Sequence, residues 1–246
     1  MIHARIVHDG TVVDARVEGD MVVAGSLRVP VAQATFAPPC VPTKIVCVGF
    51  NYRDHADEMA QDPPDEPLLF LKPPSAVIAH EAPIPYPAHT RQLEYEAELA
   101  VVIGRRCHRV PRAQALEVVW GYTAFNDITA RDAQRVEKQW VRAKAFDTSA
   151  PYGPVVATGL DPSDLRIITR VNGQVRQDSS TRYLIFDVFD LVAAASQVMT
   201  LEVGDVIATG TPPGVGALQV GDEVSVEIEG IGVLTNRVVQ GFGPLR

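Results

Sequence analysis

The first 36 residues alternate short apolar runs with turn-forming residues. Valine, isoleucine and alanine dominate the runs, and the triplets HDG at 8–10 and EGD at 18–20 separate them. This pattern is typical of short strands joined by tight turns. The proline-rich stretch at 38–42 favours a stiff linker. We therefore expect residues 1–41 to form a small N-terminal β region and residues 42–246 to form the main domain.

The main domain opens on an apolar strand at 44–50, and a short helical turn is predicted after it at 51–59. Prolines favour loops and extended chain around a second strand at 68–72. From residue 155 onward, valine, isoleucine and threonine alternate between glycine turns. Longer helical patterns occur at 110–120, 130–140 and 186–199. Because the chain has neither βαβ alternation nor a fixed-period repeat, it predicts a mixed, mostly β fold.

The composition fits an ordinary soluble globular protein, with 46% hydrophobic and 21% charged residues among 246. A net charge of −8 argues against nucleic-acid and anionic-membrane partners, which would need a basic face. We identify no signal peptide, and no apolar run approaches the ~20 residues that span a bilayer. Cys40, Cys47 and Cys107 are odd in number and contain no CxxC pair, so neither a disulfide framework nor a thiolate zinc site is indicated. We expect a cytoplasmic protein with free thiols.

Three glutamates lie two residues apart at the start of the apolar run at 94–104. Because a strand has a side-chain period of two, Glu94, Glu96 and Glu98 are expected on one face. Adjacent buried carboxylates repel one another, and a hard divalent cation such as Mg²⁺ would relieve that conflict. An exposed strand face that carries acids explains the same spacing, and taken alone the spacing favours this explanation.

A second group of polar residues begins at Asp127, after the β-like run at 121–126. Arg131 and Gln134 follow three residues apart, on one face of the predicted helix. An acid at a strand end and these two side chains are suited to line a pocket. The alternative is that Asp127 caps the helix and that Arg131 lies on a solvated face.

Further candidates supply acid–base or cationic groups. His55 and Glu58 are three residues apart, and a carboxylate beside an imidazole orients the ring for general-base catalysis; a surface pair is the alternative. Lys144 is flanked by small and aromatic residues, so it is either partly buried, where it would polarise a carbonyl or form a Schiff base, or solvated. The glycine-rich loop at 209–216 lacks the G-K-[ST] ending of a phosphate loop, so we reject nucleotide binding and expect backbone donors for a small anion.

The order of these motifs resembles the fumarylacetoacetate hydrolase family. Seven segments within residues 44–236 carry the resemblance: KIVCVGFNYRDHADE, LFLKPPSA, EYEAELAVVIG, GYTAFNDITARDAQ, AKAFDTSAPYGP, VNGQVRQDSST and LEVGDVIATGTPPGVG. The resemblance implies a β-sandwich roll with a cation, Mg²⁺ or Mn²⁺, held by acids at its mouth. The first 41 residues match only in general character, as a small variable region.

Matched motif by motif, the resemblance implies roles for nine residues. The metal ligands fall on Glu96, Glu98 and Asp127, the catalytic groups on His55, Glu58 and Lys144, and the substrate-binding positions on Arg131, Gln134 and Thr211. Glu94 matches a position that is not a ligand and is expected only to adjust the charge of the site. Ala145 departs from the family pattern, in which a serine or a glycine-like residue follows the lysine.

The resemblance implies an enzyme that acts on 2-oxo acids through an enolate. The leading expectation is metal-dependent hydrolysis of a C–C bond in a 2,4-dioxo acid of the acylpyruvate or fumarylacetoacetate type, with His55, held by Glu58, activating the water. The enzymatic alternatives are isomerisation of 2-hydroxyhepta-2,4-diene-1,7-dioate in aromatic-compound catabolism and decarboxylation of 5-carboxymethyl-2-oxo-hex-3-ene-1,7-dioate or oxaloacetate. A non-catalytic binding protein that retains the fold is a further alternative. A homodimer is expected, and Schiff-base trapping at Lys144 is not.

Overall fold

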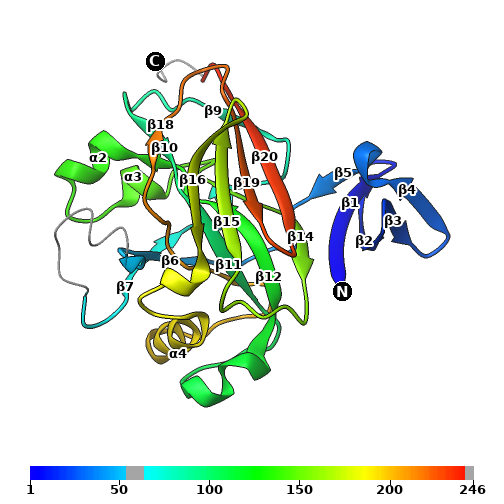
Figure 1. Cartoon of the computed structure of the whole chain (residues 1–246), viewed down its shortest axis with the longest axis horizontal. Coiled ribbons are helices and arrows are strands. Elements are labelled where there is room, and N and C mark those ends of the chain that lie inside the picture. Colours follow the sequence, from blue (N-terminus) through cyan, green and yellow to red (C-terminus); the bar gives the residue numbers. More distant parts are fainter. Residues whose placement is uncertain (54–63, 242–246) are drawn as a thin grey trace.

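A computed structural model of the chain describes residues 1–53 and 64–241, and it confirms the mostly β fold. Within these residues twelve strands form one large sheet, whose main path runs β4-β3-β2-β1-β14-β12-β11-β17-β6-β7 (Figure 1). Strands β5 and β8 pair with β1 and β14 beside this path. The twelve strands are β1 (Ile2–His8), β2 (Thr11–Glu18), β3 (Met21–Ala24), β4 (Leu27–Pro30), β5 (Thr35–Ala37), β6 (Ile45–Gly49), β7 (Leu68–Lys72), β8 (Val77–Ile78), β11 (Ala97–Ile103), β12 (Val119–Asn126), β14 (Ala150–Ala157) and β17 (Val206–Ala208).

Two smaller sheets accompany the large one in the described part of the chain. A five-stranded sheet, in the order β16-β15-β19-β20-β9, packs on β11, β12 and β14 of the large sheet. Its strands are β9 (Pro83–Pro85), β15 (Arg166–Val171), β16 (Gln174–Ser180), β19 (Glu223–Ile228) and β20 (Gly232–Val239). A three-stranded sheet has the order β13-β10-β18, with β10 (Leu93–Tyr95), β13 (Thr129–Ala130) and β18 (Gly216–Ala217).

The central strands β11 and β14 are largely apolar because both of their faces are covered, and Glu98 is the charged residue of β11. Every residue of β11 and of β14 is buried. Along β11, Leu99 and Val101 join one hydrophobic cluster, whereas Ala100 and Val102 join another on the opposite face. Glu98 therefore lies in a strand that offers its carboxylate little water, and a buried charge of this kind needs a compensating partner.

The N-terminal strands extend the large sheet rather than standing free of it. Residues Ile2, His3 and Ala4 of β1 pair with the far end of β14, and β2 to β5 continue outward from β1. In Figure 1 this region, drawn in blue, lies at one side of the molecule. The small N-terminal β region is thus present, and the proposed domain boundary after residue 41 stays a prediction.

Few helices accompany the sheets in the described residues. They are α2 (Arg131–Val136), α3 (Val141–Lys144), α4 (Val188–Val198) and the 3₁₀ helices η1 (Val31–Gln33), η2 (Pro74–Ala76), η3 (Arg112–Val118) and η4 (Thr181–Tyr183). Helix α4 confirms the helical pattern at 186–199. It begins at Asp187, whose carboxylate accepts hydrogen bonds from the backbone N–H groups of Phe189 and Asp190.

Two other predicted helices differ from the structure. The pattern at 130–140 forms two short helices, because the chain is extended at Glu137 between α2 and α3. The pattern at 110–120 forms the 3₁₀ helix η3, and Trp120 already belongs to β12, where pairing with β11 and β14 overrides the helical periodicity. The predicted turn at 51–59 falls mostly outside the described residues. Among those residues, no helix is long and apolar enough to cross a membrane.

Candidate active site

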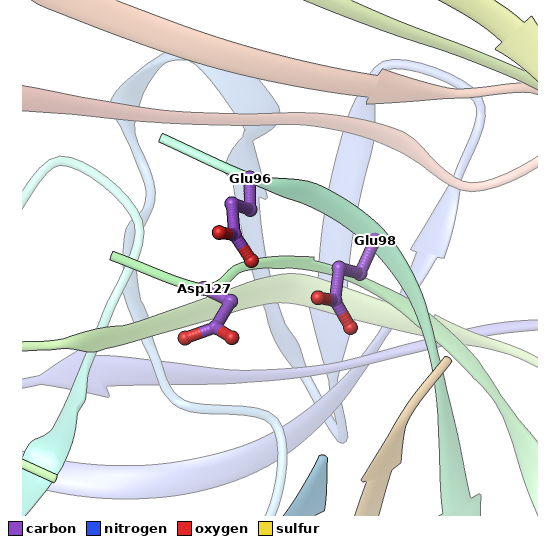
Figure 2. Close-up of side chains that lie close together, drawn as sticks. All are labelled: Glu96, Glu98 and Asp127. Atoms are coloured by element: carbon purple, nitrogen blue, oxygen red, sulfur yellow. The ribbon is translucent and has the colours of Figure 1, made fainter. Parts of the chain in front are cut away.

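Three buried carboxylates meet where β11 and β12 run side by side. Glu96 immediately precedes β11, Glu98 is its second residue, and Asp127 directly follows β12. The antiparallel register pairs Ala97 with Asn126, so the two strand ends bring Glu96 and Asp127 opposite each other. The backbone N–H of Asp127 donates to the carbonyl of Glu96 at 2.8 Å, and the N–H of Glu96 donates to Oδ1 of Asn126 at 3.0 Å. One carboxylate oxygen from each acid lies within 4.8 Å of the others (Figure 2).

The sequence pattern predicted that the three glutamates share one strand face. The structure shows that they do not. Glu94 lies in β10, which belongs to the three-stranded sheet, and the ladder is interrupted at Glu96 before β11 begins. The carboxylate of Glu94 turns to Arg131 Nε, 2.7 Å away, and to the side-chain amide of Gln92. Glu94 therefore lies outside the group of three acids, and its expected effect on the charge of the site stays a prediction.

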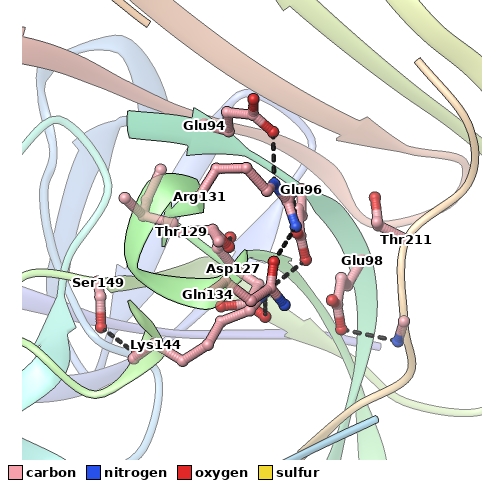
Figure 3. Close-up of polar contacts among 12 residues, drawn as sticks. Glu94, Glu96, Glu98, Asp127, Thr129, Arg131, Gln134, Lys144, Ser149 and Thr211 are labelled. Atoms are coloured by element: carbon pink, nitrogen blue, oxygen red, sulfur yellow. Dashed lines mark hydrogen bonds and ion pairs between the residues drawn. The ribbon is translucent and has the colours of Figure 1, made fainter. Parts of the chain in front are cut away.

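Cationic side chains face two of the three acids. Lys144, at the end of α3, is 2% exposed, and its Nζ lies 2.7 Å from Oε2 of Glu96 and 2.6 Å from Oδ2 of Asp127 (Figure 3). Arg131, at the start of α2, also pairs with Glu96 through Nη2. The structure thus excludes a solvated Lys144 and a solvated Arg131. It also excludes Asp127 as a helix cap, because α2 has no side-chain cap.

Glu98 differs electrostatically from Glu96. Burial, followed by repulsion from Asp127 and Glu96, raises the pKa of Glu98 well above its ordinary value. Burial also raises the pKa of Glu96, but the charges of Lys144 and Arg131 outweigh it and hold that pKa below the ordinary range. Glu98 is therefore the acid whose negative charge is least compensated within the described site.

The glycine-rich loop at 209–216 supplies one backbone donor to this cluster. The N–H of Gly210 donates to Oε2 of Glu98 at 2.8 Å. Gly210 has φ +95°, and a Cβ atom there would come within 2.9 Å of Cβ of Asn51. The expected backbone donor thus serves a protein carboxylate, and glycine is required for the loop to approach it.

Lys72 is a site residue that the motif analysis did not single out. Its side chain is fully buried, and Nζ lies 2.7 Å from Oδ1 of Asp127. Nζ also donates to the backbone carbonyls of Ile128, Lys144 and Ser149, at 3.2 Å, 2.5 Å and 2.8 Å. The available signal was a lysine that ends the otherwise apolar strand LLFLK. Such a lysine is rarely fully buried unless it is paired.

The cluster fits a hard divalent cation. In the described site the four carboxylates of Glu94, Glu96, Glu98 and Asp127 face three cationic side chains, Lys72, Arg131 and Lys144. One negative charge, centred on Glu98, is left without a cationic partner. Carboxylate oxygens are the donors that Mg²⁺ and Mn²⁺ prefer. Glu96, Glu98 and Asp127 are therefore the residues that would hold such an ion.

A cavity of about 260 Å³ opens beside Lys144 and Glu96. Its lining consists of Val48, Gly49, Phe50, Phe70, Glu96, Arg131, Gln134, Arg135, Trp140, Lys144 and Thr211. The three predicted substrate-binding residues, Arg131, Gln134 and Thr211, all belong to this lining. Their substrate contacts stay predictions, as do the catalytic and metal-binding roles. His55 and Glu58 lie outside the described residues.

Comparison with known proteins identifies the class to which this fold and site belong. The sequence profile described as "Fumarylacetoacetate (FAA) hydrolase C-terminal" matches residues 44–239, so the chain belongs to the fumarylacetoacetate hydrolase family. This match confirms the family that the motifs indicated and supports an enzymatic function.

Three particular relatives illustrate the range of activities. The crystal structure of 5-carboxymethyl-2-hydroxymuconate delta-isomerase from Mycobacterium smegmatis matches 98% of this chain and 100% of its own, with 46% identity and a TM-score of 0.92. Oxaloacetate tautomerase FAHD2A, mitochondrial, from Bos taurus is 44% identical over 85% of this chain and 71% of its own length. Maleylpyruvate hydrolase from Sphingobium sp. SYK-6, solved with manganese(II) and pyruvate, is 32% identical over 98% of this chain and 100% of its own, with a TM-score of 0.85.

Proposed function

We propose that the protein is a divalent-cation-dependent enzyme that converts 2-oxo acids through an enolate. The observation that carries this proposal is the convergence of three buried carboxylates beside a buried lysine in a small cavity. When bound, the cation supplies Lewis acidity that polarises the 2-oxo group and orients the substrate. Manganese(II) and pyruvate in the maleylpyruvate hydrolase relative support the same chemistry for this chain.

Lys144 contributes a fixed positive charge in this proposal. Burial lowers the pKa of a lysine, but Asp127 and Glu96 outweigh it and raise the pKa of Lys144 above its ordinary value. The side chain therefore stays an ammonium group, which stabilises the negative charge that develops on the enolate oxygen. A protonated amine is a poor nucleophile, so Schiff-base chemistry is disfavoured.

Isomerisation or tautomerisation of a 2-oxo acid is the first candidate reaction. It needs only enolate stabilisation and proton transfer, and the described residues supply the first of these. The isomerase and tautomerase relatives, at 46% and 44% identity, favour this outcome.

Hydrolysis of a C–C bond in a 2,4-dioxo acid is the second candidate, favoured by the maleylpyruvate hydrolase relative. It additionally needs an activated water, a role predicted for His55 and Glu58. Decarboxylation of oxaloacetate would form the same type of enolate without that water.

One set of assays separates these reactions. The purified protein is stripped with EDTA, reloaded with Mg²⁺ or Mn²⁺, and given oxaloacetate, 2-hydroxyhepta-2,4-diene-1,7-dioate and an acylpyruvate. We expect cation-dependent loss of enol absorbance with the first two substrates. Release of pyruvate from acylpyruvate would assign the hydrolase, and release of CO₂ from oxaloacetate would assign the decarboxylase. Full activity after complete chelation would overturn the cation mechanism, and no turnover of any substrate would favour the non-catalytic alternative.

A further inference from the structure

Helix α2 presents three long polar side chains to the cavity. Arg131, Gln134 and Arg135 stand at i, i+3 and i+4, so they share one face of the helix, and all three line the cavity. The positive charge of Arg131 is compensated within the protein, because its guanidinium forms ion pairs with both Glu94 and Glu96. Arg131 therefore brings no uncompensated positive charge to the outer part of the cavity.

Arg135 is in the opposite situation. Among the described residues it forms no ion pair, and its hydrogen bond runs from Nη1 to Oε1 of Gln92 at 2.8 Å. The amide nitrogen of Gln92 in turn donates to Oε1 of Glu94 at 2.6 Å. A neutral amide thus stands between Arg135 and the nearest acid of this network. It orients the guanidinium without cancelling its charge, and four of the five N–H donors of that group are left for another partner.

The acids around the cavity do not compensate Arg135 either. Of the described residues that line the cavity, Glu96 is the one acid, and Lys144 and Arg131 already neutralise it. Arg135 is exposed, whereas Glu96 and Lys144 are buried, so the unpaired cation marks the outer part of the cavity.

Three aromatic side chains also line the cavity. The rings of Phe70 and Trp140 meet edge to face at 5.4 Å, and Phe50 lies 6.4 Å from Trp140. Phe50 has φ +55°, a backbone conformation that a bulky residue rarely adopts. We call Phe50, Phe70 and Trp140 the aromatic wall. Its rings can contact a planar carbon chain with their faces or with their edges.

We propose that Arg135 forms a second anion subsite, which binds the distal carboxylate of a 2-oxo dioic acid while the chain between the two acid groups lies along the aromatic wall. The inference rests on the proposed function, which locates the first carboxylate and the 2-oxo group at the three-acid cluster. A guanidinium fork matches a carboxylate in a bidentate pair. A monoacid of the same length leaves Arg135 unpaired, so the protein selects dioic acids over monoacids.

The test compares two ligands that differ at one end. Binding of 2-oxoadipate and of 2-oxohexanoate to the Mn²⁺-loaded protein is measured by calorimetry. A charged hydrogen-bonded pair contributes about 1.5–3 kcal/mol, so we expect the wild type to bind 2-oxoadipate about 10- to 100-fold more tightly. Arg135→Met retains the apolar stem and should abolish this preference without weakening 2-oxohexanoate. Arg135→Lys retains the charge without the fork and should keep part of it.

Arg142→Met is the matched control, because Arg142 is exposed and does not line the cavity. It should preserve the preference of the wild type. Equal affinity of the wild type for both ligands, or equal weakening of both by Arg135→Met, overturns the subsite and leaves the proposed function intact. Failure of the Mn²⁺-loaded wild type to bind either 2-oxo acid overturns both.

Discussion

A single buried ammonium group ties together the segments that build the site. Lys72 comes from β7, yet its Nζ contacts Asp127 after β12, the backbone carbonyl of Lys144 at the end of α3, and that of Ser149 beyond α3. These partners lie 55 to 77 residues further along the chain. Lys72 thus acts as a positioning residue for a predicted metal ligand and for the segment that carries Lys144.

Replacing Lys72 by methionine tests this role. Removing one partner of a buried ion pair costs about 3–5 kcal/mol, which for a chain of this size lowers Tm by roughly 6–20 °C. We also expect lower activity in the folded fraction, because Asp127 and Lys144 lose their common support. Lys138→Met, at an exposed position, is the control and should leave Tm nearly unchanged. A Lys72→Met protein that melts with the wild type would contradict the role.

Substitutions of Glu98 and Glu94 form a matched pair that tests the predicted metal ligands. Glu98→Gln preserves shape but removes a carboxylate from the three-acid cluster, whereas Glu94→Gln changes an acid outside it. Even residues that only support metal ligands contribute about 10- to 100-fold to metal affinity, so we expect at least that loss of Mn²⁺ affinity in Glu98→Gln. Glu94→Gln should lose clearly less. Calorimetric titration with Mn²⁺ measures both, and equal losses would refute the assignment of Glu98 as a ligand.

At the scale of elements, the motifs selected side chains that lie close together in the structure, whereas periodicity alone misplaced two of the helices around them. The acids of the cluster and Lys144 were selected because their spacing and order match a family pattern, and their roles stay predictions. The helix expected at 110–120 became η3 and the start of β12, since strand pairing with β11 competes with a local helical period. Lys72 was missed for a related reason, because its four oxygen partners come from segments that no local pattern connects to it.

The loop that carries Gly210 allows a prediction at this scale. In Gly210→Ala the new Cβ would meet Asn51 at 2.9 Å, so the loop must move and withdraw its N–H from Glu98. Gly221 has a similar φ of +99° but nothing within 4 Å of its Cβ position. Gly221→Ala should therefore cost only the backbone strain, about 1–2 kcal/mol. Gly210→Ala should cost more and should also weaken Mn²⁺ binding, as measured by thermal unfolding and calorimetry. Equal effects of the two substitutions on both measurements would contradict the role of the close approach.

At the scale of the whole molecule, the large sheet makes the N-terminal strands and the site parts of one hydrogen-bonded network. Strand β1 pairs with β14, β14 with β12, and β12 with β11, which carries Glu98. The sequence indicated a separate small β region because prolines and turn residues set it apart. It could not indicate the pairing of β1 with β14, which joins residues about 150 positions apart.

This continuity predicts a single cooperative unfolding transition. Calorimetric and van't Hoff enthalpies should agree in differential scanning calorimetry. Ala4→Asp, at a buried position of β1, should shift that whole transition to lower temperature, whereas Val7→Asp, at an exposed position of the same strand, should shift it little. An early transition that separates from the main one in Ala4→Asp would show that the N-terminal region unfolds independently.

The antiparallel register of β11 and β12 has a thermodynamic consequence. A slip of one residue would turn Glu98 toward the opposite hydrophobic cluster and disperse the three acids, so a cation that needs all three binds one register alone. A ligand that binds only the native state stabilises it by about 2.7 kcal/mol at a free concentration of 100 Kd. The Tm measured over a series of Mn²⁺ concentrations therefore follows the binding of the cation, so that thermal stability reports the occupancy of the site.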